Sequence, residues 1–212
     1  MCPWATIRAV MFDLGGVLEQ TPRTGWQRRW AGRLGLTEAQ ISDRLGPIWS
    51  KGSIGALTLA QVEASTAAAL ALDHADLRAM MDDAWAEYVG TLNIELTRYF
   101  SGLRPRYRTG IVSNSFVGAR ERELALYGFE ELCDTIVYSH EVGVMKPDPA
   151  IYLIACRRLD VTPGEVVFLD DVPANVQAAA ELGMTAITFL STDQAIAELQ
   201  RLLRTTRSLP QR

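Results

Sequence analysis

The sequence has few of the residues that build most zinc and redox centres. Its 212 residues include only two histidines, His74 and His140, which are too few for a histidine-based zinc site. The three cysteines, Cys2, Cys133 and Cys156, are far apart and contain no CxxC pair. An odd, scattered set of this kind forms no disulfide framework and is typical of a reducing compartment. We therefore expect a cytoplasmic protein.

Long apolar runs and blocks of one charge are absent as well. The longest apolar stretches, such as AAALAL, are much shorter than the roughly 20 residues that cross a bilayer. Arg8 and Asp13 bracket too short an apolar stretch for a signal peptide. The net charge is −4 and no basic block occurs, unlike a nucleic-acid-binding surface. We expect neither a membrane nor a nucleic acid as partner.

The remaining composition is that of an ordinary globular protein. Hydrophobic residues make up 48% of the chain and charged residues 22%. A chain of 212 residues suits one large domain, or a core with one inserted module. Lys51 and Lys146 are the only lysines. A lysine inside a motif is therefore less likely to be there by chance.

Five apolar, β-branched runs predict buried strands. Their continuous apolar character favours a parallel sheet covered on both faces. Helical patterns separate the later runs, and Asp148 and Pro149 have the residue types of an N-cap and first helical position. We therefore predict an α/β fold with a doubly wound parallel sheet. The predicted strands are Ile7–Phe12, Thr109–Ser113, Thr135–Tyr138, Val166–Leu169 and Thr185–Phe189, and the later helices are Phe116–Tyr127, Pro149–Leu159 and Pro173–Leu182.

The first two predicted strands are separated by a long interval with helical patterns and no convincing strand. A crossover between parallel strands needs only about a dozen residues, so most of this interval is surplus. We assign residues 1–18 and 93–212 to an α/β core and residues 19–92 to an inserted helical cap, and expect a frayed tail after Arg204. The predicted cap helices are Thr24–Leu34, Thr37–Leu45, Thr58–Leu70 and Asp76–Tyr88, and the first core helix after them is Asn93–Leu103.

Polar groups follow four of the apolar segments. They are Asp13, Ser113-Asn114, Lys146 and Asp170-Asp171. Each alone has an ordinary explanation as a turn residue, helix cap or solvated charge. Ligands of open α/β sheets bind beyond the carboxyl ends of the strands, where these groups would meet. Adjacent carboxylates repel each other unless a cation is near, so the combination suits phosphoryl transfer with a metal.

Four segments of the chain resemble, in order, the four motifs of the haloacid dehalogenase (HAD) superfamily. The segments are FDLGGVLE, IVSNS, VGVMKPDPAIY and VFLDDVPANVQAAAELGM. The resemblance covers essentially the whole chain, and FDLGGV is similar to a phosphatase-like branch. It implies a Rossmann-like core, and the helical interval falls where the family's type 1 (C1) cap sits.

The resemblance also implies roles for individual residues. Asp13 would attack phosphorus and form an aspartyl-phosphate, which divides one displacement into two easier ones. Ser113 would bind a non-bridging phosphoryl oxygen, with the Asn114 backbone or side chain assisting. Lys146 would hold both Asp13 and the phosphoryl group as a compact positive charge.

The implied cofactor is Mg²⁺, bound by Asp13, the Gly15 carbonyl oxygen, Asp170 and Asp171. This all-oxygen ligand set suits magnesium. Asp171 would be the direct carboxylate ligand, with Asp170 binding directly or through water. Asn175 follows on the next helix and could support the metal-site loop, although its position in the first helical turn explains it adequately.

One position departs from the family pattern. Family phosphatases usually carry a general-acid aspartate two residues after the nucleophile, and here that position is Gly15. A positioned acid contributes about 10²–10⁴-fold in rate. Glu19 is our candidate for a replacement, because the loop after the first strand would let it return toward the site.

We therefore predict a Mg²⁺-dependent phosphatase, monomeric or homodimeric, acting on a small phosphorylated metabolite, for which a sugar phosphate is one candidate. A metal-independent 2-haloacid dehalogenase is the first alternative, because that branch also lacks the second aspartate. Phosphonate cleavage would need a cap lysine such as Lys51. A family member that binds a phosphorylated ligand without turnover is the non-enzymatic alternative.

Overall fold

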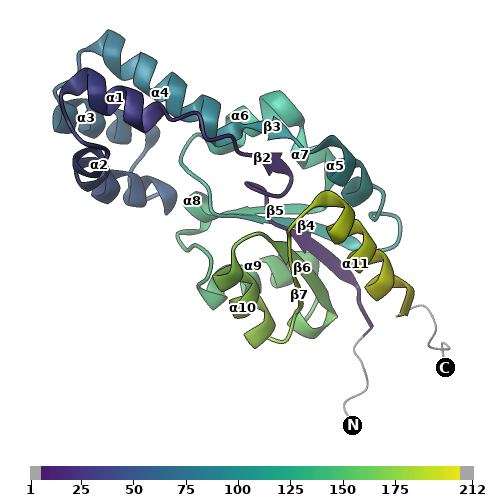
Figure 1. Cartoon of the computed structure of the whole chain (residues 1–212). Helices are drawn as coiled ribbons and strands as arrows, with labels where there is room; N and C mark the ends of the chain where they lie inside the picture. The colour runs from purple at the N-terminus through teal and green to yellow at the C-terminus, as the bar shows by residue number, and fades with distance from the viewer. Residues whose placement is uncertain (1–5, 206–212) are drawn as a thin grey trace.

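The computed structural model describes residues 6–205, and its core is a parallel sheet in the order β5-β4-β1-β6-β7 (Figure 1). The central strand β1 lies between β4 and β6, with Phe12 opposite both Ile111 and Leu169. The predicted doubly wound α/β fold is confirmed, and the strand bounds differ from the prediction by at most two residues. The strands are β1 Ala9–Phe12, β4 Arg108–Ser113, β5 Thr135–Tyr138, β6 Val166–Asp170 and β7 Thr185–Thr188.

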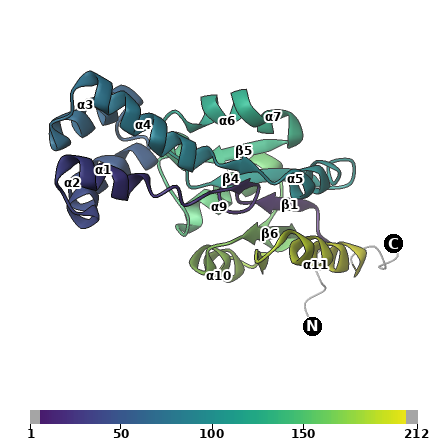
Figure 2. The ribbon, with the colours of Figure 1, turned by 45° about the horizontal axis from the view of Figure 1, so that its top comes forward.

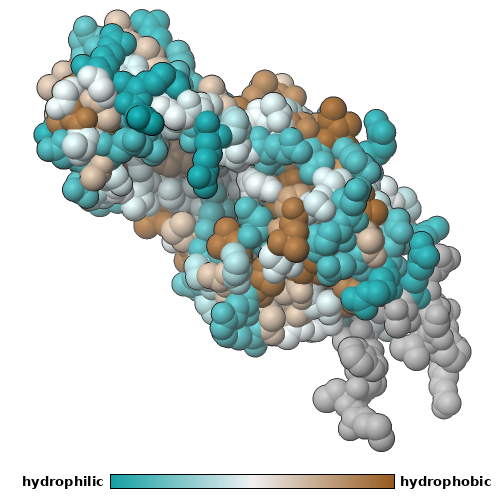
Figure 3. Space-filling view, viewed as in Figure 1, coloured by the Kyte–Doolittle hydropathy of each residue, from teal (hydrophilic) through white to brown (hydrophobic). Residues whose placement is uncertain are grey.

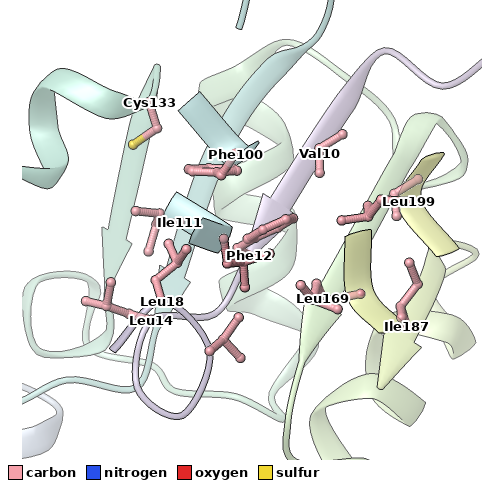
Figure 4. Packing of buried hydrophobic residues seen from close by; sticks show 14 of the residues in the cluster. Val10, Phe12, Leu14, Leu18, Phe100, Ile111, Cys133, Leu169, Ile187 and Leu199 are labelled. Carbon is pink, nitrogen blue, oxygen red and sulfur yellow. The ribbon is translucent and has the colours of Figure 1, made fainter. Parts of the chain in front are cut away.

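Helices cover both faces of the sheet (Figure 2). Side chains alternate along β1, so Val10 and Phe12 enter one apolar cluster and Ala9 and Met11 the other. In the first cluster Phe12 stacks on Phe100 of α5, with ring centroids 4.6 Å apart (Figure 4). Each large side chain buried in this way stabilises the fold by about 1.5–3 kcal/mol. The sheet is therefore a rigid platform for whatever its strand ends carry.

The core helices begin and end close to the predicted positions. The Asp148 carboxylate accepts from the Ala150 N–H at 2.8 Å and caps α9 as expected. Helix α6 starts later than predicted, because Gly118 before it has φ +90° and the preceding residues form a loop. The helices of the core are α5 Ile94–Ser101, α6 Ala119–Tyr127, α7 Phe129–Leu132, α8 Ser139–Val142, α9 Pro149–Leu159, η1 Pro163–Glu165, α10 Pro173–Glu181 and α11 Thr192–Thr205.

Helix α11 was not among the predicted elements. Ala195, Leu199 and Leu203 recur every four residues along it and pack into the cluster that contains Phe12. That spacing is the pattern of a helix with one apolar face. The frayed tail predicted after Arg204 lies, from residue 206 onward, outside the described residues.

Four helices between β1 and β4 form the helical insertion, a group beyond the carboxyl end of the sheet (Figure 1). The chain enters and leaves this group through a short antiparallel pair, β2 Glu19–Gln20 and β3 Thr91–Leu92, which was not predicted. The outer surface of the insertion is mostly hydrophilic in the view of Figure 3. None of the described helices is long and apolar enough to cross a membrane. The insertion helices are α1 Trp26–Leu34, α2 Glu38–Ser53, α3 Leu59–Leu70 and α4 His74–Val89.

Helix α2 continues to Ser53, whereas the prediction ended it at Leu45 before Gly46-Pro47. A proline inside a helix removes one backbone hydrogen bond. Here the half of α2 after Pro47 carries Trp49, whose ring stacks 5.6 Å from that of Trp26. Tertiary packing therefore prevails over the local preference.

Candidate active site

Asp13 lies immediately after β1, at the centre of the sheet's carboxyl edge. Its backbone N–H donates to the Leu169 carbonyl at 2.8 Å, which ties it to β6. Its side chain is buried, and the Leu14 N–H donates to its Oδ1 at 2.7 Å. Neighbouring strands therefore fix the direction of this carboxylate.

Lys146 is the cation that faces Asp13. Its side chain is fully buried, and Nζ lies 2.6 Å from Asp13 Oδ1 and 2.7 Å from Asp170 Oδ2. Burial raises the pKa of Asp13 to about 7, while the Lys146 charge acts in the opposite direction. One ammonium shared by two buried carboxylates leaves the site short of positive charge.

Asp13, Asp170 and Asp171 form an acidic trio whose ligand atoms all lie within 4.8 Å of one another. Burial, and then the Asp170 charge, raise the pKa of Asp171. A divalent cation would relieve this repulsion, and carboxylate oxygens are the ligands that Mg²⁺ takes in proteins. The trio therefore fits the metal that the sequence predicted.

The turn after Asp13 brings the backbone against this trio. A Cβ on Gly16 would lie 2.4 Å from Asp171 Oδ2, and its φ is +79°. The Gly16 N–H donates to the Glu19 carbonyl at 2.7 Å, and Gly15 forms a β-bridge with Glu19. Only glycine satisfies both the close approach and the left-handed backbone at residue 16.

Asp170 is held by hydrogen bonds from its own loop and helix. The Val172 N–H donates to Oδ1 at 2.8 Å, and Asn175 Nδ2 lies 3.1 and 3.2 Å from the two carboxylate oxygens. Of the two explanations for Asn175, helix position is insufficient, because its amide supports the metal-site loop by bonding to Asp170. An amide on the first turn after an Asp-Asp pair is the signal that would have found it, since a buried carboxylate needs donors.

Ser113 and Asn114 follow β4 on the other side of Asp13. Ser113 is buried, and within the described residues its hydroxyl makes no hydrogen bond. The Asn114 side chain is already engaged: Nδ2 donates to the Lys146 carbonyl at 2.8 Å and Oδ1 accepts from the Lys146 N–H at 2.7 Å. The amide thus joins two loops, and the Ser113 hydroxyl is the group left free for a ligand.

Glu19, the candidate proton donor, lies in β2 at the base of the helical insertion. Its side chain is buried, and Oε1 has no hydrogen-bond partner among the described residues. Burial, the neighbouring Glu123 and the Asp13 charge raise the pKa of Glu19 to about 9. The carboxyl therefore holds its proton at neutral pH and is close enough to Asp13 to feel its charge.

The insertion meets the core through the loop that follows Ser113. Phe116 in this loop lies 5.5 Å from the Trp49 ring and 5.8 Å from the Trp85 ring, measured between centroids. The Ser139 hydroxyl donates to the Ser53 carbonyl at 2.7 Å. The contacts of Phe116 join the loop after the phosphate-binding candidate Ser113 to the insertion helices. Lys51, by contrast, is exposed.

Comparisons with known proteins point to one family. A model of the haloacid dehalogenase-like hydrolases matches residues 7–183. The chain is 27% identical over 186 residues to D-ribitol-5-phosphate phosphatase of Bacteroides thetaiotaomicron, covering 84% of this chain and 89% of that protein. It is 29% identical over 205 residues to acyl-CoA dehydrogenase family member 10 of Mus musculus, covering 92% of this chain but only 19% of that relative.

A solved structure shares the fold. The magnesium complex of a HAD family enzyme from Bacteroides thetaiotaomicron superposes with a TM-score of 0.79 at 21% identity, covering 92% of this chain and 99% of that one. The family model spans most of the sequence. The chain belongs to the haloacid dehalogenase-like hydrolases.

Proposed function

We propose that the protein is a Mg²⁺-dependent phosphatase that hydrolyses a small phosphorylated metabolite through an aspartyl-phosphate. The observation that carries the proposal is the buried Lys146 ammonium between Asp13 and Asp170, beside the exposed Asp171. A nucleophilic carboxylate needs cationic help to approach a phosphate dianion, and this arrangement supplies it.

The metal would be held by the carboxylates of Asp13, Asp170 and Asp171 and by the Gly15 carbonyl oxygen. When bound, Mg²⁺ neutralises phosphoryl charge and aligns the transferred group. Since Asp170 already accepts hydrogen bonds at both oxygens, the more exposed Asp171 is the better direct ligand.

The protein's own groups perform the remaining steps. Asp13 Oδ attacks phosphorus and the bond to the leaving oxygen breaks, which leaves a phosphoryl group on the carboxylate. The Ser113 hydroxyl and the Lys146 ammonium hydrogen-bond the phosphoryl oxygens. Water then attacks the aspartyl-phosphate, releases inorganic phosphate and restores Asp13.

The proton for the leaving oxygen has no donor at Gly15, and we assign it to Glu19. That side chain is protonated at neutral pH, as a general acid must be. Replacement by Gln keeps the shape but removes the acid. Glu19→Gln is expected to lower kcat for alkyl phosphates and to leave kcat for aryl phosphates unchanged, because aryl leaving groups need no proton. If the variant kept the wild-type kcat on alkyl phosphates, Glu19 would not be the acid.

We further propose that residues 19–92 act as the cap that closes over the substrate. The two-residue strands β2 and β3 at its base resemble a hinge, and the similarity to D-ribitol-5-phosphate phosphatase favours a polyol or sugar phosphate as substrate. Cytoplasmic location and a monomeric or homodimeric state stay predictions.

The deciding experiment is phosphate release from a panel of phosphorylated metabolites with Mg²⁺, with and without EDTA. Asp13→Asn is the control that removes the nucleophile. Metal-dependent release that disappears in Asp13→Asn supports the phosphatase. The lack of a second aspartate at Gly15 favours a dehalogenase as the second candidate, and halide release from 2-haloacids in EDTA would establish that activity instead.

A further inference from the structure

A hollow lined by arginines lies at the opposite end of the sheet from Asp13. Its volume is about 700 Å³, and its walls come from the residues before β1, the turn before β4 and the end of α9. Figure 1 shows the amino end of β1 at the side of the core that faces away from the helical insertion. Five of the chain's arginines line it: Arg8, Arg104, Arg106, Arg108 and Arg158.

Acidic side chains compensate only part of this positive charge. Arg104 donates from Nε to Asp134 at 2.9 Å, and Arg8 pairs with Glu165 at 3.3 Å. Arg108 approaches Asp160 at 3.4 Å, where both side chains are largely exposed. An exposed pair of this length contributes little stability, so the Arg108 guanidinium is not committed to Asp160.

Among residues 6–205 the other two arginines, Arg106 and Arg158, form no ion pair, and Arg158 acts on the Glu141 carboxylate only through its charge. Arg158 donates to the Ile136 carbonyl at 2.8 Å, a neutral group that fixes the guanidinium without cancelling its charge. Arg108 is positioned in the same way by the Leu159 carbonyl at 2.8 Å. The exposed Arg106 side chain forms no hydrogen bond or ion pair within residues 6–205. In a chain of net charge −4, five arginines around one hollow, two of them without an ion pair among the described residues, need an explanation.

We infer that this arginine hollow is a second anion site, which binds a compact polyanion such as the di- or triphosphate group of a metabolite. Planar guanidinium groups bind phosphate oxygens in pairs, and several of them face one space of metabolite size. Ile7, Pro105 and Tyr107 add apolar surface that an organic portion of the ligand would contact.

The hollow is separate from the candidate active site. The four residues of β1 span about 13 Å at roughly 3.3 Å per residue, and Arg8 and Asp13 lie at its two ends. A phosphoryl group on Asp13 therefore leaves the arginine hollow free. The inference is independent of the reaction catalysed at Asp13.

The test is isothermal titration calorimetry of the whole protein with inorganic tripolyphosphate in EDTA, with citrate in a second arm to separate phosphate from carboxylate ligands. Arg106→Gln removes the unpaired charge without breaking any contact. Arg28→Gln, an exposed arginine of the insertion helix α1, is the matched control for net charge. Arg158→Gln provides a second position in the hollow.

We expect tripolyphosphate to bind the wild type, and Arg106→Gln and Arg158→Gln each to weaken binding about tenfold, because each removes a charge-assisted hydrogen bond. Arg28→Gln should leave the affinity unchanged, and turnover at the active site should be the same in all four proteins. The inference is overturned if tripolyphosphate does not bind, if Arg106→Gln binds as well as the wild type, or if Arg28→Gln weakens binding equally.

Discussion

Replacing Lys146 by methionine tests the charge balance of the site most severely. The ammonium is fully buried within 2.7 Å of two carboxylate oxygens, on Asp13 and on Asp170. Methionine fills a similar volume but leaves both carboxylates without their cation. Breaking a buried pair in this way costs about 3–5 kcal/mol in the free energy of unfolding. We expect a loss of that size at pH 8 in EDTA.

The loss should depend on pH and on metal. Burial raises the pKa of Asp13, and that carboxyl takes up a proton more readily at pH 5, so Lys146→Met should be less destabilised there than at pH 8. Added Mg²⁺ should recover part of the loss at pH 8, because it replaces the missing positive charge. Phosphatase activity should be abolished, because no ammonium then holds the phosphoryl group beside Asp13.

Urea denaturation at both pH values measures these differences. Lys51→Met is the matched control, since it removes the other lysine, which is exposed at the end of α2. That substitution should change stability by less than about 1 kcal/mol. If Lys146→Met were no more destabilised than Lys51→Met at pH 8, the reasoning about a buried, shared ammonium would be wrong.

Three further substitutions follow from the site. Gly16→Ala places a Cβ 2.4 Å from a carboxylate oxygen of the acidic trio and should lower the affinity for Mg²⁺ at least about tenfold in calorimetry. The control is Gly25→Ala, because Gly25 has a similar φ of +69° but its Cβ would meet nothing within 4 Å. Equal Mg²⁺ affinities in the two variants would contradict the argument. Burial raises the pKa of Glu123 from its ordinary value of 4.5 to about 7, so the folded protein keeps a proton that the unfolded chain releases, and stability falls as pH rises between these values. Glu123→Gln should therefore match the wild type at pH 4.5 and be more stable at pH 8, by at most about 3 kcal/mol, in urea titrations; no gain at pH 8 would refute this. A Cβ at Gly15 meets only one atom within 4 Å, so Gly15→Asp fits and, in the Glu19→Gln background, should restore kcat on alkyl phosphates by up to about 10²-fold, with a smaller gain on aryl phosphates; equal effects on both would count against an acid acting at that position.

The sequence predicts the sheet and the meeting of the four motifs well, and for a physical reason. Buried parallel strands are continuous apolar runs, and groups that follow them must share one edge. Asp13, Lys146 and Asp170 therefore come together as expected. The ion pairs between them depend on the tertiary structure, because no spacing along the chain specifies which carboxylates share the ammonium.

The differences arise where tertiary contacts prevail over local preference. Pro47 suggests the end of a helix, yet packing of Trp49 against its neighbours sustains α2 beyond it. Asn175 has an adequate local explanation, and only the fold places its amide on Asp170. The arginine hollow is likewise invisible in sequence, because Arg8, the turn before β4 and Arg158 meet only when the sheet forms.

The central claim is that Asp13 accepts a phosphoryl group covalently. Rapid acid quenching of the enzyme with Mg²⁺ and a substrate from the metabolite panel, followed by peptide mass spectrometry, tests it directly. The account predicts one phosphoryl group on the peptide that contains Asp13, formed before phosphate release and absent from Asp13→Asn. Turnover with no phosphorylated peptide in any quenched sample, or continued phosphate release by Asp13→Asn, would contradict it.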